Sequence, residues 1–92
     1  MNTSTRRFIV QGRVQGVGFR YATVRKAEEL GLTGWVKNLP AGDVETVAQG
    51  EAEMLEEFER WLWIGPDYSR VSRVELKNPP NNYFDGFEIH RY

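Results

Sequence analysis

A glycine-rich segment followed by an arginine is the part of this sequence best suited to bind an anion. The segment reads Gly12-Arg13-Val14-Gln15-Gly16-Val17-Gly18, and Phe19-Arg20 follow it directly. Glycines let the backbone curl so that several amide groups point at an anion, and the planar guanidinium of Arg20 can hold two phosphate oxygens at once. A helix that begins here would add unpaired amides and a partial positive charge. The segment could bind phosphate, but these residues alone favour the other interpretation, a tight turn followed by a surface arginine.

The glycine spacing excludes two common nucleotide-binding loops. No Gly-Lys-Ser/Thr follows the segment, so it is not a Walker loop. Glycines at 12, 16 and 18 do not fit the dinucleotide pattern Gly-x-Gly-x-x-Gly.

An asparagine at the end of a predicted strand is the second candidate for chemistry. The run Trp35-Val36-Lys37-Asn38 is typical of a strand, and a turn signal, Leu39-Pro40-Ala41-Gly42-Asp43, comes after it. The amide of Asn38 can donate with one end and accept with the other, and could therefore hold a water molecule in place. Starting the turn before Pro40 is the commoner role of such an asparagine.

Other kinds of catalytic site find little support. The chain has no cysteine and a single histidine, His90, so a thiolate or multi-histidine metal site and a cysteine nucleophile are excluded. No serine lies in a nucleophile elbow. We therefore expect no metal and no cofactor.

Charge is unevenly distributed along the chain. The net charge is -1, which suggests no bulk polyanion such as a nucleic acid as partner. Residues 1–27 contain six bases and no acid, whereas residues 28–67 contain ten acids and two bases. The acid-free part could hold an anion locally, or could be a solvated basic face.

The order of predicted elements indicates a ferredoxin-like βαββαβ sandwich, with two helices on one face of an antiparallel sheet of four or five strands. Alternation predicts a first strand with Phe8 and Val10 on one face, and helical spacing predicts a second helix with Leu55, Phe58 and Leu62 in its apolar stripe. The expected strands cover 7–14, 33–38, 44–48, 71–76 and 87–92, and the expected helices cover 19–30 and 51–64. We expect one domain over residues 1–92, with residues 1–6 flexible.

The fold does not define the chemistry, because it hosts many functions. An RNA-recognition domain would need aromatic residues on its central strands, but Asp43-Val44-Glu45-Thr46-Val47 has none and carries acids. A metal chaperone of this fold would need a cysteine pair. A regulatory domain that binds an anion without turnover is a further alternative, but it has no need of a residue such as Asn38 to hold water.

Two long motifs resemble those of the acylphosphatase family. Residues Gly12 to Arg20 resemble its signature Gly-x-Val-Gln-Gly-Val-x-Phe-Arg, and Gly34-Trp35-Val36-Lys37-Asn38 resembles its second signature, Gly-[aromatic]-Val-[Arg/Lys]-Asn. Val44 to Gly50, Gly65-Pro66 and Phe87-Glu88-Ile89 resemble further parts of the family pattern, so the resemblance covers nearly the whole chain.

The resemblance implies an enzyme that hydrolyses acyl phosphates without a metal. A cytoplasmic protein is expected from the sequence itself, which has no cysteine and no N-terminal apolar stretch long enough for a signal peptide. It implies that Arg20 binds the phosphate and that Asn38 positions the attacking water. The phosphate would also be bound by backbone amides of Gln15, Gly16, Val17, Gly18, Phe19 and Arg20. We expect a monomer whose partners are the acyl phosphate and, as competitors, inorganic phosphate or sulfate. No segment of the sequence approaches the length of a membrane span, so no membrane partner is expected.

Overall fold

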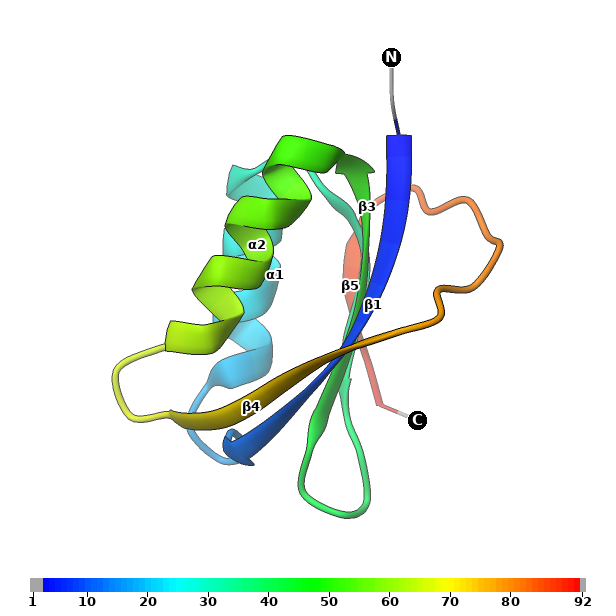
Figure 1. Cartoon of the computed structure of the whole chain (residues 1–92). Coiled ribbons are helices and arrows are strands. Elements are labelled where there is room, and N and C mark those ends of the chain that lie inside the picture. The colour runs from blue at the N-terminus through cyan, green and yellow to red at the C-terminus, as the bar shows by residue number, and fades with distance from the viewer. Residues whose placement is uncertain (1–2, 92) are drawn as a thin grey trace.

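The protein is a two-layer sandwich in which two helices cover one face of a five-stranded sheet (Figure 1). The computed structural model describes residues 3–91. The strands are β1 (Thr3–Arg13), β2 (Thr33–Asn38), β3 (Val44–Glu51), β4 (Arg70–Lys77) and β5 (Phe87–His90), and the helices are α1 (Phe19–Glu29) and α2 (Ala52–Ile64). The element order β-α-β-β-α-β with an additional final strand confirms the predicted ferredoxin-like fold.

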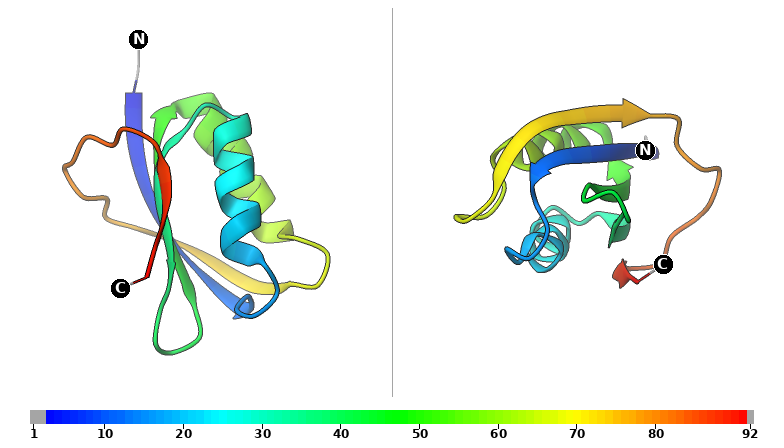
Figure 2. Two further views of the ribbon diagram at one scale, coloured as in Figure 1. Left: turned by 180° about the vertical axis from the view of Figure 1, so that it is seen from behind. Right: turned by 90° about the horizontal axis from the view of Figure 1, so that it is seen from below.

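The sheet has the strand order β4-β1-β3-β2-β5 and is mixed rather than wholly antiparallel. Three neighbouring pairs are antiparallel, but β5 runs parallel to β2. The loop 78–86 carries the chain from β4 at one edge to β5 at the other (Figure 2). Because this loop reverses the chain direction, β5 is antiparallel to β4 and therefore parallel to β2. The sequence expectation of an antiparallel sheet holds for every pair except this one.

Strand β1 begins at Thr3, before the expected start at Arg7. Residues Thr3 to Arg6, for which flexibility is expected from the sequence, pair with Glu51 to Ala48 of β3. Met1 and Asn2 lie outside the described residues. The predicted alternation of β1 is confirmed, because Phe8 and Val10 are fully buried between the sheet and the helices.

The core lies between the sheet and the helices, and aromatic side chains connect its parts. Phe58 of α2 packs against Phe8 of β1 and Phe87 of β5, with ring centroids 6.1 Å apart in both pairs. The apolar stripe predicted for α2 is confirmed by the burial of Leu55, Phe58 and Leu62. Burying a large apolar side chain of this kind contributes about 1.5–3 kcal/mol, so this stripe holds α2 on the sheet.

Gln49 of β3 anchors the loop 78–86 to the sheet. Its side-chain amide donates hydrogen bonds to the carbonyl of Asn82 at 2.8 Å and to Oγ1 of Thr5 at 2.9 Å. Its Oε1 accepts a hydrogen bond from the backbone N–H of Phe84 at 3.1 Å. These contacts hold the loop in the course that delivers β5 to its place beside β2.

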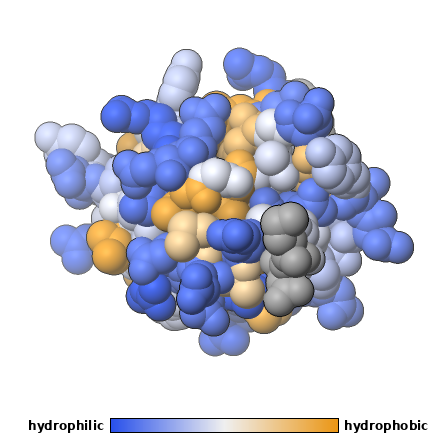
Figure 3. Space-filling model, turned by 90° about the horizontal axis from the view of Figure 1, so that it is seen from above, coloured by the Kyte–Doolittle hydropathy of each residue, from blue (hydrophilic) through white to orange (hydrophobic). Residues whose placement is uncertain are grey.

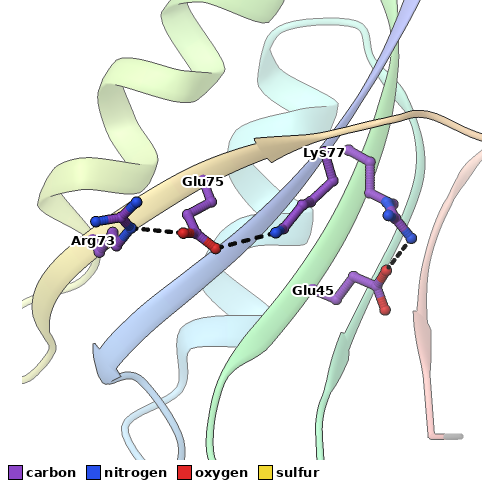
Figure 4. A network of polar contacts seen from close by, with 5 residues as sticks. Glu45, Arg73, Glu75 and Lys77 are labelled. Carbon is purple, nitrogen blue, oxygen red and sulfur yellow. Dashed lines mark hydrogen bonds and ion pairs between the residues drawn. The ribbon is translucent and has the colours of Figure 1, made fainter.

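The sheet face opposite the helices carries ion pairs (Figure 4). Glu75 of β4 lies between Arg73, at 2.8 Å, and Lys77, at 3.4 Å. Hydrogen bonding and charge attraction from Lys77, and then from Arg73, lower the pKa of the Glu75 carboxyl. This face therefore remains polar and does not form a second apolar layer.

Figure 3 shows the end of the molecule at which β1 begins. This surface is mainly hydrophilic, with apolar side chains gathered near its centre. Over residues 3–91, no helix is both long and apolar enough to cross a membrane.

Candidate active site

The glycine-rich loop joins β1 to the N-terminus of α1, as the sequence predicts. Gly16 and Gly18 have φ angles of 74° and 77°, in the left-handed region that other residues rarely adopt. Gly18 is the N-cap of α1, no side chain caps this helix end, and no acidic residue lies in its first turn. The first amides of a helix have no partner within it, and at this end no capping side chain supplies one. These amides are therefore suited to bind an anion.

Arg20 is held in place by the buried residue that precedes it. Phe19 is buried and packs against Trp61 of α2, with ring centroids 5.7 Å apart. Thr23 Oγ1 donates a hydrogen bond to the Phe19 carbonyl at 2.7 Å, which fixes the first turn of α1. Arg20 is half-buried beside this anchor. In the described part of the chain it forms no ion pair, so its guanidinium has no carboxylate partner there.

Asn38 is the last residue of β2 and pairs with Val44 of β3. Its side-chain Oδ1 is buried and has no hydrogen-bond partner in residues 3–91. A buried acceptor without a partner is costly, and such groups are usually satisfied by water or a ligand. The orphaned oxygen therefore favours the interpretation in which Asn38 holds a water over the one in which it only shapes the turn.

The side chain of Gln15 ties the glycine-rich loop to the turn that follows Asn38. Its amide donates to the carbonyls of Leu39, at 2.9 Å, and Asp43, at 2.8 Å. The turn itself is closed by a hydrogen bond from the Leu39 N–H to the Asp43 carbonyl at 2.8 Å. Gln15 thus connects the two motifs that are expected to hold the phosphate and the water. The sequence suggested only a backbone role for this residue.

Two adjoining cavities lie where the loop, α1 and the ends of β2 and β5 meet. The smaller, of about 160 Å³, is lined by residues of all four segments: Val14, Gly16, Gly18, Phe19, Arg20, Tyr21, Asn38, Ile89 and Arg91. The larger, of about 610 Å³, is lined by Arg20, Lys37, Asn38, Leu39, Pro40 and Arg91. Arg20, Asn38 and Arg91 line both cavities, so they stand at the junction between them. The smaller volume is far above the roughly 10–15 Å³ that one water requires, which leaves room for a tetrahedral anion together with a water.

The structure brings most of the predicted site residues together. Arg20 and Asn38 line the same cavity, with Gly16, Gly18 and Phe19 around them. Gln15 and Val17 are not among its lining residues: the Gln15 side chain turns toward the β2–β3 turn, and Val17 packs against the core.

Arg91 is a residue of the site that sequence reasoning missed. It follows β5, whose register pairs His90 with Lys37 of β2 and so places Arg91 beside Asn38. A signal was present in the alternation of the final strand, because Arg91 falls on the same face as the apolar Phe87 and Ile89. Arg91 is exposed in the structure, so it borders the two cavities from the solvent side.

The chemical character of both cavities is cationic. Arg20, Arg91 and, in the larger cavity, Lys37 are among the lining residues, and neither cavity is lined by an aspartate or a glutamate. In residues 3–91, no group of three or more histidine, cysteine, aspartate or glutamate side chains is arranged to hold a metal ion. Together the fold and the site define a ferredoxin-like α/β protein with an anion-binding loop next to a buried, unsatisfied amide oxygen.

Comparison with known proteins shows to which family of this class the chain belongs. The acylphosphatase family model matches residues 6–89. The chain is 50% identical over 82 residues to an acylphosphatase of Trichormus variabilis, covering 89% of this chain and 81% of that protein. It is 47% identical over 89 residues to an acylphosphatase of Vibrio parahaemolyticus, covering 97% and 99% of the two chains. The solved structure of an acylphosphatase from Coxiella burnetii superposes with a TM-score of 0.92 at 44% identity, covering 97% and 94%. The chain therefore belongs to the acylphosphatase family.

Proposed function

We propose that this protein hydrolyses the carboxyl–phosphate bond of acyl phosphates, giving a carboxylate and inorganic phosphate, without a metal or cofactor. The observation that carries the proposal is the shared lining of the smaller cavity. Arg20, the glycine-rich loop and Asn38 meet there, and the name of the family to which the chain belongs denotes this activity.

In this proposal the phosphate binds against the start of α1. Arg20 contributes a fork of N–H donors to two phosphate oxygens, and backbone amides of residues 15–20 contribute further donors. Transfer of a phosphoryl group depends mainly on positioning and on stabilising the charge of the equatorial oxygens. A cationic side chain and an array of amides supply that stabilisation, and they are already in place before the reaction begins.

The leaving group explains why so few catalytic groups suffice. An acyl phosphate releases a carboxylate, whose conjugate acid has a pKa of about 4. The electron pair of the broken P–O bond stays on that carboxylate, which leaves without being protonated. An alkyl phosphate would release an alkoxide and would need a general acid, and no acidic side chain lines either cavity in the described residues.

Asn38 would position the nucleophilic water. Its Oδ1 accepts a hydrogen bond from the water, which orients a lone pair of the water oxygen toward phosphorus. The new P–O bond forms as the bond to the carboxylate breaks, and a phosphate oxygen of the substrate accepts the proton that the water loses. No protein base is required in this scheme. We also propose that the protein acts as a monomer in the cytoplasm. The cysteine-free composition supports the cytoplasmic location.

The test compares two classes of phosphate compound. Benzoyl phosphate and acetyl phosphate should be hydrolysed, with release of inorganic phosphate, by protein dialysed against a chelator. A simple alkyl phosphate monoester under the same conditions should not be hydrolysed. Equal rates on both classes would contradict the leaving-group argument, and no turnover of either acyl phosphate would overturn the proposed function.

A further inference from the structure

The larger cavity extends away from the phosphate-binding loop. The glycines that line the smaller cavity are absent from its walls, and Lys37, Leu39 and Pro40 replace them. Since Arg20 and Asn38 stand at the junction, a phosphate in the smaller cavity would direct the rest of its molecule into the larger one. The larger cavity is thus placed to receive the acyl group, and its 610 Å³ leaves room for a sizeable one.

The walls of this cavity combine an apolar part with cations. Leu39 and Pro40 present apolar surface, whereas Arg20, Lys37 and Arg91 carry positive charge. Arg91 forms no ion pair in the described part of the chain. If Arg20 is occupied by the phosphate, Arg91 remains for a different group of the substrate.

Lys37 lines the larger cavity, but its ammonium lies over the sheet face opposite the helices. Val36 is fully buried in the core, so Lys37, the next residue of β2, points to the other face. The ammonium lies there, 3.7 Å from Oε1 of Glu45 and 5.2 Å from the centroid of the Trp35 ring. Its charge is therefore turned away from Arg20 and the glycine-rich loop.

We propose that the larger cavity selects acyl phosphates whose acyl group carries a second negative charge, such as a carboxylate, and that Arg91 recognises this charge. The inference rests on the proposed function, because it names the substrate class of the same site. An apolar body would lie against Leu39 and Pro40, with its anionic end near Arg91.

The experiment uses three matched substrates that differ at the far end of one aromatic ring. They are benzoyl phosphate, which has no second charge, 4-carboxybenzoyl phosphate, which is anionic there, and 4-(aminomethyl)benzoyl phosphate, which is cationic. The value of kcat/KM is measured for each at low ionic strength, where screening is weak, and is divided by the rate of uncatalysed hydrolysis. We expect a preference of roughly five-fold for the anionic over the uncharged substrate, and the lowest value for the cationic one.

A variant then assigns the preference to a particular side chain. Arg91→Gln should bring the ratio of the anionic to the uncharged substrate to about one. Arg73→Gln is the matched control, since it removes one positive charge on β4, the far edge strand of the sheet. That variant should keep the wild-type ratio, which separates local recognition from the overall charge of the protein. Thermal unfolding of each variant verifies that it is folded.

The outcomes distinguish the two proposals. Hydrolysis of all three substrates with equal efficiency would overturn the selection of a second charge and leave the proposed function intact. A preference that persists in Arg91→Gln would also overturn it, because the named cation would not be its cause. Failure to hydrolyse any of the three would overturn the proposed function and this inference with it.

Discussion

The side-chain amide of Gln15 donates a hydrogen bond to the carbonyl oxygen of Leu39 at 2.9 Å, across a sequence separation of 24 residues. Gln15 lies in the loop before α1, and Leu39 directly follows Asn38. The same amide also donates to the Asp43 carbonyl at 2.8 Å. A single side chain thus holds the loop proposed to bind phosphate at a defined position relative to the residue proposed to hold water.

Replacing Gln15 by glutamate tests this connection with almost no change in shape. A carboxylate cannot donate a hydrogen bond, so the variant at neutral pH would face two carbonyl oxygens with a negative charge. We expect kcat for benzoyl phosphate to fall by roughly ten-fold or more. Protonation of the new carboxyl restores one donor, and burial beside two carbonyls raises its pKa above the ordinary value of about 4.3. Relative to wild type, the loss should therefore shrink as the pH falls through that raised pKa.

Gln11→Glu is the control for this substitution, because it makes the same change near the end of β1, while the hydrogen bonds to the β2–β3 turn come from Gln15. It should keep the wild-type rate and pH profile. If Gln15→Glu behaved in the same way, the hydrogen bonds to the turn would have no part in positioning the site.

Arg20→Lys separates the geometry of the guanidinium from its charge. Lysine keeps the positive charge but cannot present two parallel donors to one phosphate. Hydrogen bonds to charged groups contribute about 1.5–3 kcal/mol, so inhibition by inorganic phosphate or sulfate should weaken by roughly ten-fold or more, together with a loss of kcat. Arg73→Lys on β4 should change neither. Retention of the wild-type inhibition constant by Arg20→Lys would contradict a bidentate role.

The elements of the fold could be predicted because burial of one face places apolar residues at regular intervals in the sequence. Phe8 and Val10 stand two residues apart, on one face of their strand, and Phe58 and Leu62 follow one another at helical spacing. The pairing of β5 with β2 could not be predicted in this way. Parallel and antiparallel edge strands show the same short alternation, and their direction depends on the course of the loop 78–86. The contacts of Gln49 that hold this loop are set by tertiary structure.

The site was predictable to the extent that its groups belong to local motifs. A glycine-rich turn before a helix brings its own amides and Arg20 together, and the end of a strand before a turn marks Asn38. The two motifs meet in one cavity, but the roles of Arg20 and Asn38 in the reaction stay predictions. Arg91 and the side chain of Gln15 reach the site through contacts between distant segments, which no local spacing specifies.

Gln49→Leu should destabilise the protein by releasing the loop 78–86. The variant loses hydrogen bonds to Thr5, Asn82 and Phe84. Each of these hydrogen bonds contributes up to about 1 kcal/mol to stability. We therefore expect the unfolding free energy to fall by about 1–3 kcal/mol and Tm to fall by at least about 5 °C. Thermal unfolding measures the change, and Gln11→Leu on β1 is the control. An unchanged Tm would show that the loop is held by other contacts.

A chelator should leave the activity intact. The proposed reaction uses Arg20 and backbone amides to stabilise charge and releases a carboxylate that needs no Lewis acid. Dialysis against a chelator, followed by a phosphate-release assay on acetyl phosphate, measures this. A loss of activity that magnesium restores would instead indicate that a metal clamps the phosphate.

Asn38→Ala should separate binding of the phosphate from its transfer. The variant removes Oδ1, which is buried and has no partner in residues 3–91, but leaves Arg20 and the loop amides in place. Loss of one well-placed polar group in an active site costs on the order of 10²–10³ in kcat. We therefore expect kcat to fall by about that factor while the inhibition constant for inorganic phosphate stays nearly constant. Removing a buried acceptor that lacks a partner should not lower Tm by much.

If Asn38 only shaped the turn before Pro40, the opposite pattern would follow: a lower Tm with normal kcat for the folded protein. Asn81→Ala, in the exposed loop 78–86, makes the same change away from the site and should alter neither quantity. Measurement of Tm, kcat and phosphate inhibition on these two variants decides between the roles, because a stable Asn38→Ala protein with normal kcat would remove Asn38 from the mechanism.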